Sequence, residues 1–290
     1  MTTVVYLHGV GGSAPAWNGR GWDLSLRSAL AAVRPDLSGG FDTVAVDFDD
    51  LMDRPGLVRR QGASDFDYLD DQRGDAGRVI TGSAEQNGQI TAYRRRRDRL
   101  SEVVQDCSDA AAPPGVRWPC FLPGEMMVRV PLWDMRQAGH YRHDRSVQSH
   151  VLDRVSEQIE QIDDDVILLA HSLGSVVALD ALHMRSVQIG MFISFGSPIG
   201  VDPTWGGRWE GSGTFPYDRV GSWLNVVNLH DFITWRRGLS RRFPEAVDAF
   251  IRAGVGFAGP GNFHDPATYL GSGPVVAAVA AYLDSDGGCG

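Results

Sequence analysis

The sequence is poor in cysteine, since its 290 residues include only Cys107, Cys120 and Cys289. An odd number of cysteines at this spacing fits neither a zinc site nor a disulfide framework. The first residues, MTTVVYLHGVGG, also lack the basic segment and the apolar core of a secretory signal peptide. We therefore expect free thiols and a location in the reducing cytoplasm.

The sequence also lacks an excess of basic residues and any long apolar run. Its 27 Lys and Arg residues are outnumbered by 36 Asp and Glu, which gives a formal net charge of -9. Such a balance disfavours general binding to nucleic acid. The most apolar segment, residues 274–283, is about half as long as the roughly 18 residues that span a bilayer. We expect no nucleic-acid partner and no stable membrane insertion, and no pattern indicates an oligomeric state.

Short apolar runs alternate along the chain with segments of helical periodicity. Hydrophobic residues make up 43% of the sequence, enough for a sizeable core. Runs typical of strands cover residues 2–9, 41–48, 164–172, 191–198, 222–234 and 246–258, and helical spacing covers 21–33, 146–162, 175–184 and 274–283. This alternation predicts an α/β fold, with a mostly parallel sheet and helices on both faces. We expect one domain over residues 1–290.

Residues 52–139 interrupt this alternation. They are rich in Gly, Asp, Arg and Pro, and they are far longer than a plain crossover needs. We interpret them as a cap or insertion between the second strand and the helix that precedes the third. The run YRRRRDRL, residues 93–100, is more typical of a solvated helix face paired with acids than of a phosphate-binding patch.

Ser172 stands between an apolar strand and an apolar helix, in the segment AHSLG. A serine hydroxyl is a poor nucleophile unless it is exposed beside a base, and a tight strand–turn–helix corner provides that exposure. Such a corner brings the residues two before and two after the serine close together, and these are the small residues Ala170 and Gly174. The following helix N-terminus suits a developing oxyanion. The alternative is a serine that merely caps the helix.

Together with YLHGVGG, residues 6–12, this segment resembles the α/β-hydrolase superfamily, in particular its lipase- and esterase-like members. The resemblance covers the core strands and helices, and it does not cover residues 52–139. It implies an α/β-hydrolase fold in which the backbone N–H groups of Val10 and Leu173 hold the oxyanion. It also implies that His8 braces the oxyanion loop. Alanine at position 170, where the family usually has glycine, is a tolerated variant.

The resemblance implies the chain order Ser, then Asp or Glu, then His. Asp231 ends an apolar strand, and His264 lies in a glycine-rich loop before the last helix. His264 would take the proton from Ser172 and return it to the leaving group, while Asp231 would orient the imidazole. Asp202, after the preceding strand, is the alternative acid. A surface turn for Asp231 and a packing role for His264 are the structural alternatives.

Several other residues near these positions are weaker candidates. His230 adjoins Asp231, and Asp265 adjoins His264, where neighbouring side chains rarely make the required hydrogen bond. His140 and His143 have no motif around them. In the segment FGSP, residues 195–198, Gly and Ser are expected to form a turn. The tryptophan-rich residues 204–223 form either a flap over an acyl pocket or a loop packed on the sheet.

Residues 9–14 also match G-x-G-x-x-A after a strand, the dinucleotide-binding fingerprint. Asp47, at the end of the next strand, would then bind a ribose. Asp47 lies 36 residues after Gly11, further than the usual spacing of roughly 20. An NAD(P)-dependent oxidoreductase is therefore the alternative enzyme class, and a hydrolase-like scaffold that only binds a partner is a second alternative.

The favoured prediction is a serine hydrolase that cleaves a carboxylic ester, thioester or amide through an acyl-enzyme on Ser172. Its partner would be a small-molecule acyl substrate, and neither a metal nor an organic cofactor is implied. An acyltransferase would use the same three side chains, with an alcohol or amine in place of water.

Overall fold

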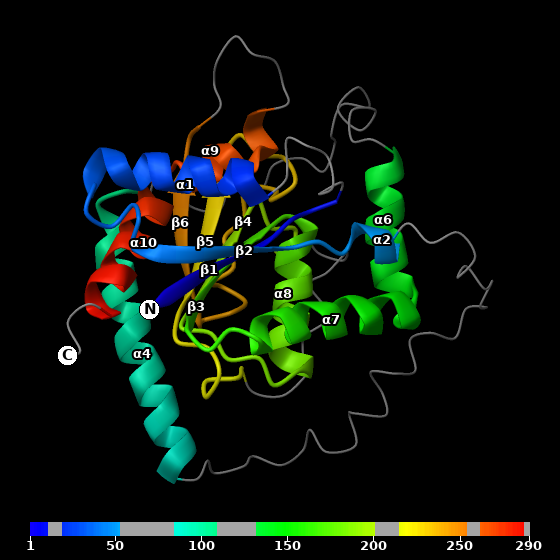
Figure 1. The fold of residues 1–290 in the computed structure, drawn as a ribbon, viewed down its shortest axis with the longest axis horizontal. Coiled ribbons are helices and arrows are strands. Elements are labelled where there is room, and N and C mark those ends of the chain that lie inside the picture. Colours follow the sequence, from blue (N-terminus) through cyan, green and yellow to red (C-terminus); the bar gives the residue numbers. More distant parts are fainter. Residues whose placement is uncertain (11–18, 53–83, 109–131, 201–214, 254–261, 287–290) are drawn as a thin grey trace.

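Six parallel strands form one sheet at the centre of the protein (Figure 1). The computed structural model describes residues 1–10, 19–52, 84–108, 132–200, 215–253 and 262–286. The strand order is β2-β1-β3-β4-β5-β6. The strands are β1 (Thr2–Leu7), β2 (Phe41–Val46), β3 (Asp165–His171), β4 (Met191–Phe195), β5 (Trp223–Asn228) and β6 (Ala246–Ile251). The predicted α/β fold with a parallel sheet is thus confirmed.

Helices cover both faces of the sheet, as the continuous apolar strands require. In β1, Val4 and Tyr6 join one apolar cluster, whereas Val5 and Leu7 join the other. The first cluster contains side chains of α1 (Gly19–Val33), α9 (Pro266–Leu270) and α10 (Gly273–Asp286). The second contains side chains of α2 (Asp49–Met52), α6 (Leu132–His143), α7 (Arg145–Glu160) and α8 (Leu173–Met184).

The strand order reverses at the centre of the sheet. From β1 the chain passes through α1 to β2 on one side, whereas β3 pairs with β1 on the other side. In parallel α/β sheets, ligands bind outside the carboxyl ends of the strands at such a reversal. The segments that follow β1 and β3 are therefore the expected place for a ligand site.

Part of the predicted insertion closes the β6 edge of the sheet. Helix α4 (Ala84–Gln105) contacts β6 and α10. It buries Tyr93, Leu100 and Val104, and the Tyr93 hydroxyl donates to the Glu245 carbonyl at 2.9 Å. The arginine run thus lies on a helix whose apolar residues face the core. Arg94, Arg95 and Arg96 are exposed, as expected for a solvated helix face. Residues 53–83 and 109–131 lie outside the described residues, so the cap stays a prediction.

Two predicted strands end earlier than expected. The run 222–234 forms a strand only to Asn228, and the chain then turns through Asp231, which is fully buried. In the run 246–258 the strand ends at Ile251, and residues 254–258 lie outside the described residues. Of the tryptophan-rich segment, residues 215–223 are described. Phe215 is buried, with its ring stacked on Trp223, so this part packs on the sheet.

No described helix combines the length and apolarity that a membrane span needs.

Candidate active site

Ser172 connects β3 to α8 in a strained conformation. Its φ of 51° and ψ of -125° are rare for a residue with a side chain. Its N–H donates to the Phe195 carbonyl at the end of β4, at 3.1 Å. Strain of this kind persists only where the surroundings over-determine it, and it is concentrated at functional sites. Ser172 makes no side-chain hydrogen bond to the helix N-terminus, so it is not an ordinary helix cap.

The corner requires a very close approach between the end of β1 and the start of α8. A Cβ at Gly174 would lie 2.4 Å from the His8 carbonyl oxygen and 2.6 Å from that of Leu7. A Cβ at Gly9 would lie 2.7 Å from the Ser172 Cβ. The sequence correctly indicated a small residue at 174. The nearest obstacles, however, are the carbonyl groups of Leu7 and His8, at the end of β1, rather than Ala170.

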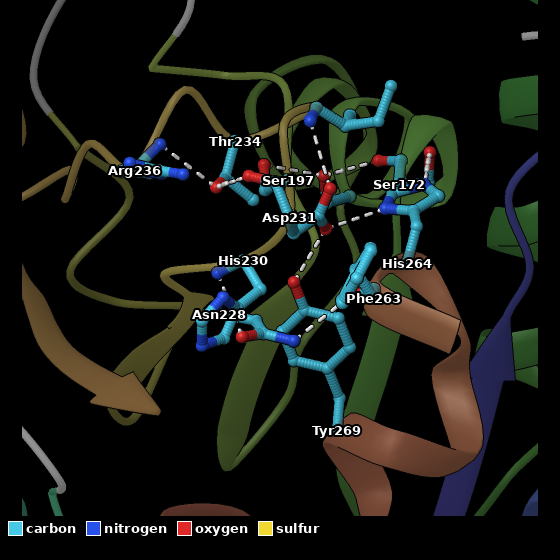
Figure 2. A network of polar contacts seen from close by, with 12 residues as sticks. Ser172, Ser197, Asn228, His230, Asp231, Thr234, Arg236, Phe263, His264 and Tyr269 are labelled. Carbon is cyan, nitrogen blue, oxygen red and sulfur yellow. Dashed lines mark hydrogen bonds and ion pairs between the residues drawn. The ribbon is translucent and has the colours of Figure 1, made fainter. Parts of the chain in front are cut away.

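Three side chains that lie far apart in the sequence form a hydrogen-bonded chain (Figure 2). His264 Nε2 lies 2.9 Å from Ser172 Oγ, and His264 Nδ1 lies 2.7 Å from Asp231 Oδ2. His264 ends the short 3-10 helix η3 (Asn262–His264), after β6. With the Nδ1 proton directed at the carboxylate, Nε2 is the acceptor for the serine proton. The structure thus brings together all three side chains that the sequence had singled out.

The Asp231 carboxylate is buried but well supplied with donors. Its Oδ2 also accepts from the Tyr269 hydroxyl at 2.6 Å, and its Oδ1 accepts from the Ile233 N–H at 2.9 Å. A buried carboxylate is tolerated when it is hydrogen-bonded in this way. Asn228 adds a further link, since its side-chain amide donates to the Phe263 carbonyl at 3.1 Å. This bond ties the His264 loop to the end of β5.

His264 packs against a second histidine. The rings of His264 and His171 have centroids 4.4 Å apart. Burial, together with the nearby His264, holds the pKa of His171 well below its usual range, so His171 stays neutral. A Cβ at Gly196, whose φ is 57°, would lie 2.9 Å from His171 Nε2 and 3.1 Å from His264 Cε1. The turn after β4 therefore needs glycine to leave room for both rings.

Two serine hydroxyl groups make contacts next to this corner that the sequence did not indicate. Ser175 Oγ lies 2.5 Å from the Ser172 carbonyl oxygen and 2.7 Å from Ser197 Oγ, and Ser197 Oγ accepts from the Ile199 N–H at 3.2 Å. The Ser175 hydroxyl therefore links the predicted turn after β4 to the carbonyl group of Ser172. Both hydroxyls were missed because isolated serines leave no periodic signal in a sequence.

The two predicted oxyanion donors follow the ends of neighbouring strands. Leu173 is the first residue of α8, where helix geometry leaves N–H groups without an acceptor inside the helix. Val10 directly follows Gly9, the residue that approaches the Ser172 side chain. Their assignment as oxyanion donors stays a prediction.

His8 links the loop after β1 to the loop after β2. Its buried ring stacks on Phe48, its Nδ1 lies 2.5 Å from the Gly9 carbonyl oxygen, and its Nε2 lies 3.5 Å from Asp47 Oδ1. Burial lowers the pKa of His8, but the hydrogen bonds to Asp47 and Gly9 and the charge of Asp49 raise it more, so the net shift is upward. The hydrogen bond to His8 lowers the pKa of Asp47 to about 2.

The other residues that the sequence analysis considered either lie outside the described residues or make other contacts. Asp202 and residues 11–14 of the glycine fingerprint lie outside the described residues. Asp265 caps α9 by accepting from the Ala267 N–H, and His140 Nδ1 lies 2.9 Å from the Met52 carbonyl oxygen. In the described part of the chain, the one cluster with metal-compatible spacing is His8, Asp47 and Asp49, whose ligand atoms lie within 4.8 Å of one another.

The sequence matches no protein-family model, and it matches no curated protein significantly. The arrangement offers a hydroxyl whose proton can pass to an imidazole, and a buried carboxylate that orients this imidazole and stabilises its cation.

We predict opposite effects for two glycine-to-alanine substitutions in helices. Gly174→Ala should lower the free energy of unfolding by about 3 kcal/mol or more, because the new methyl group collides with β1 backbone. Gly88→Ala, on α4 with nothing within 4 Å, should raise it by about 0.5–1 kcal/mol. Urea unfolding measures both, and equal effects would contradict the close approach.

We also predict that the His8–Asp47 pair makes stability depend on pH. A raised His8 pKa contributes stability that is full below the unfolded pKa of about 6.5 and is lost as pH rises through the folded value. The native protein should therefore melt at a higher temperature than Asp47→Asn, and this difference in melting temperature should be larger at pH 5.5 than at pH 9. Asp42→Asn, at an exposed position of β2, is the control and should show no such trend. A difference for Asp47→Asn that is constant with pH would refute the pairing.

Proposed function

We propose that this protein is a serine hydrolase of the α/β-hydrolase type that cleaves a carboxylic ester or a related acyl bond. The observation that carries the proposal is the hydrogen-bonded chain from Ser172 through His264 to Asp231, at the carboxyl ends of the strands. The order Ser, Asp, His along the chain is the one that the resemblance implies.

The proposed reaction begins with attack of Ser172 Oγ on the acyl carbonyl carbon, while the hydroxyl proton passes to His264 Nε2. The tetrahedral oxyanion is held by the N–H groups of Leu173 and Val10. When the intermediate collapses, the bond to the leaving group breaks and the imidazolium returns its proton to that group. The acyl chain then remains on Ser172.

In the second half, water attacks the acyl-enzyme and gives a proton to His264. Collapse releases the carboxylic acid, and the proton returns to Ser172 Oγ. An alcohol or amine that entered in place of water would make the protein an acyltransferase with the same residues. Asp231 keeps Nδ1 protonated and stabilises the imidazolium in both halves.

The two alternatives, an NAD(P)-dependent oxidoreductase and a scaffold that only binds a partner, explain the observed site less well. For a nicotinamide-dependent oxidoreductase, Asp47 would have to bind a ribose, but its Oδ1 already contacts His8 and accepts from the Asp49 N–H. Neither that chemistry nor a binding scaffold uses the strained Ser172 or its contact with His264.

We expect Asp231→Asn to lower kcat by about 10⁴-fold, because the imidazole then takes the wrong tautomer. The matched control is Asp265→Asn, which removes the charge next to His264 but keeps a good helix cap, and its kcat should change little. Hydrolysis of nitrophenyl esters of increasing acyl length measures both variants, and melting temperatures show that each is folded.

Asp202→Asn tests the alternative acid. A loss in Asp202→Asn that exceeds the loss in Asp231→Asn would move the acid to the segment after β4. Unchanged kcat in Asp231→Asn would contradict the proposed role of the buried carboxylate.

A further inference from the structure

We propose that Tyr269 is a positioning residue of this site, and that its hydroxyl tunes the basicity of His264 through the shared Asp231 oxygen. The assignment of a catalytic purpose to this contact rests on the proposed function. Tyr269 belongs to the five-residue helix α9. It is not part of any motif that the sequence analysis singled out.

Two donors converge on one carboxylate oxygen. Asp231 Oδ2 lies 2.7 Å from His264 Nδ1 and 2.6 Å from the Tyr269 hydroxyl (Figure 2). Both distances are those of short, charge-assisted hydrogen bonds. Because one oxygen serves both donors, the negative charge that the hydroxyl attracts is less available to an imidazolium at His264.

A single short segment of the chain holds both donors. His264 ends η3, Asp265 caps α9 by accepting from the Ala267 N–H, and Pro266 begins the helix that carries Tyr269. Proline at the first helical position fixes the backbone at the junction. The imidazole and the phenol are thus presented to Asp231 together, rather than by two independent loops.

The Tyr269 ring is held firmly, and its hydroxyl keeps its proton. The residue is fully buried and packs near Phe195, with ring centroids 5.5 Å apart. Burial and the neighbouring Asp231 raise the pKa of Tyr269 well above its usual value. The phenol is therefore a donor over the whole working range of pH.

The chain contains a matched control. Tyr141 is also fully buried, and its hydroxyl donates to the Asp180 carboxylate at 2.7 Å, in the cluster on the opposite face of the sheet. Tyr269→Phe and Tyr141→Phe therefore each remove one buried hydroxyl from one buried carboxylate. Of these two carboxylates, only that of Asp231 contacts His264.

The test is an NMR titration of the His264 ring in the native protein, Tyr269→Phe and Tyr141→Phe. The signal is assigned as the one that His264→Gln loses among the eight histidines. Loss of the Tyr269 hydroxyl should raise the pKa of His264 by about one pH unit, because the carboxylate then interacts more strongly with the imidazolium. Tyr141→Phe should leave the titration unchanged.

Ester hydrolysis supplies a second readout. In Tyr269→Phe the acid limb of the pH profile of kcat/KM should move to higher pH, so that activity on that limb falls about tenfold. An unchanged or lowered His264 pKa in Tyr269→Phe would overturn the assignment, and so would an equal shift in Tyr141→Phe. Absence of Ser172-dependent hydrolysis would refute the proposed function instead, and the NMR titration would still decide the coupling.

Discussion

The close backbone approach between the end of β1 and the start of α8 is the constraint on which the site depends. The Leu7 and His8 carbonyl oxygens occupy the space that any side chain at position 174 would need. With glycine there, α8 begins directly after the carboxyl end of β3. Ser172, between the two, has a backbone conformation that residues with a side chain rarely adopt. The hydroxyl that results stands at the strand-order reversal, where the loops after β1 and β3 meet.

The other half of the site depends on how a buried charge is satisfied. Asp231 has no exposed surface, and its two oxygens accept from His264, Tyr269 and the Ile233 N–H. Removing any of these donors would leave the buried charge less fully hydrogen-bonded, which is costly. The carboxylate therefore fixes where the imidazole and the phenol can lie. Asn228 fixes the same loop a second time through the Phe263 carbonyl.

These two constraints meet at His264. Its Nε2 faces the strained serine, its Nδ1 faces the buried acid, and one side of its ring packs on His171. Because His171 stays neutral, it adds no opposing charge next to the imidazolium that the proposed reaction forms. The side chain of His264 remains about one quarter exposed, which leaves it accessible from solvent.

The parts of this arrangement that arise from local pattern were predictable from the sequence. The apolar runs predicted all six strands, and the small residues around Ser172 predicted the sharp corner. Asp231 and His264 could be chosen because the resemblance fixes their order along the chain. The expected strand ran past Asn228 because the apolar residues continue, although the backbone turns there to bury Asp231.

Contacts between isolated polar residues were not predictable. Tyr269, Ser175 and Ser197 act through single hydroxyl groups on partners distant in sequence or across a turn, and no periodicity records such a pairing. The role of α4 was hidden for a different reason. Its apolar stripe is interrupted by a run of arginines, so the packing against β6 is visible only when the helix is in place.

Covalent labelling shows whether Ser172 is an activated nucleophile, as the proposed function requires. The purified protein is treated with a fluorophosphonate, and the intact mass and the modified peptide are measured alongside Ser172→Ala and His264→Gln. We predict one adduct that maps to Ser172, none in Ser172→Ala, and much slower labelling in His264→Gln. An unlabelled native protein, or an adduct that persists in Ser172→Ala, would contradict the account.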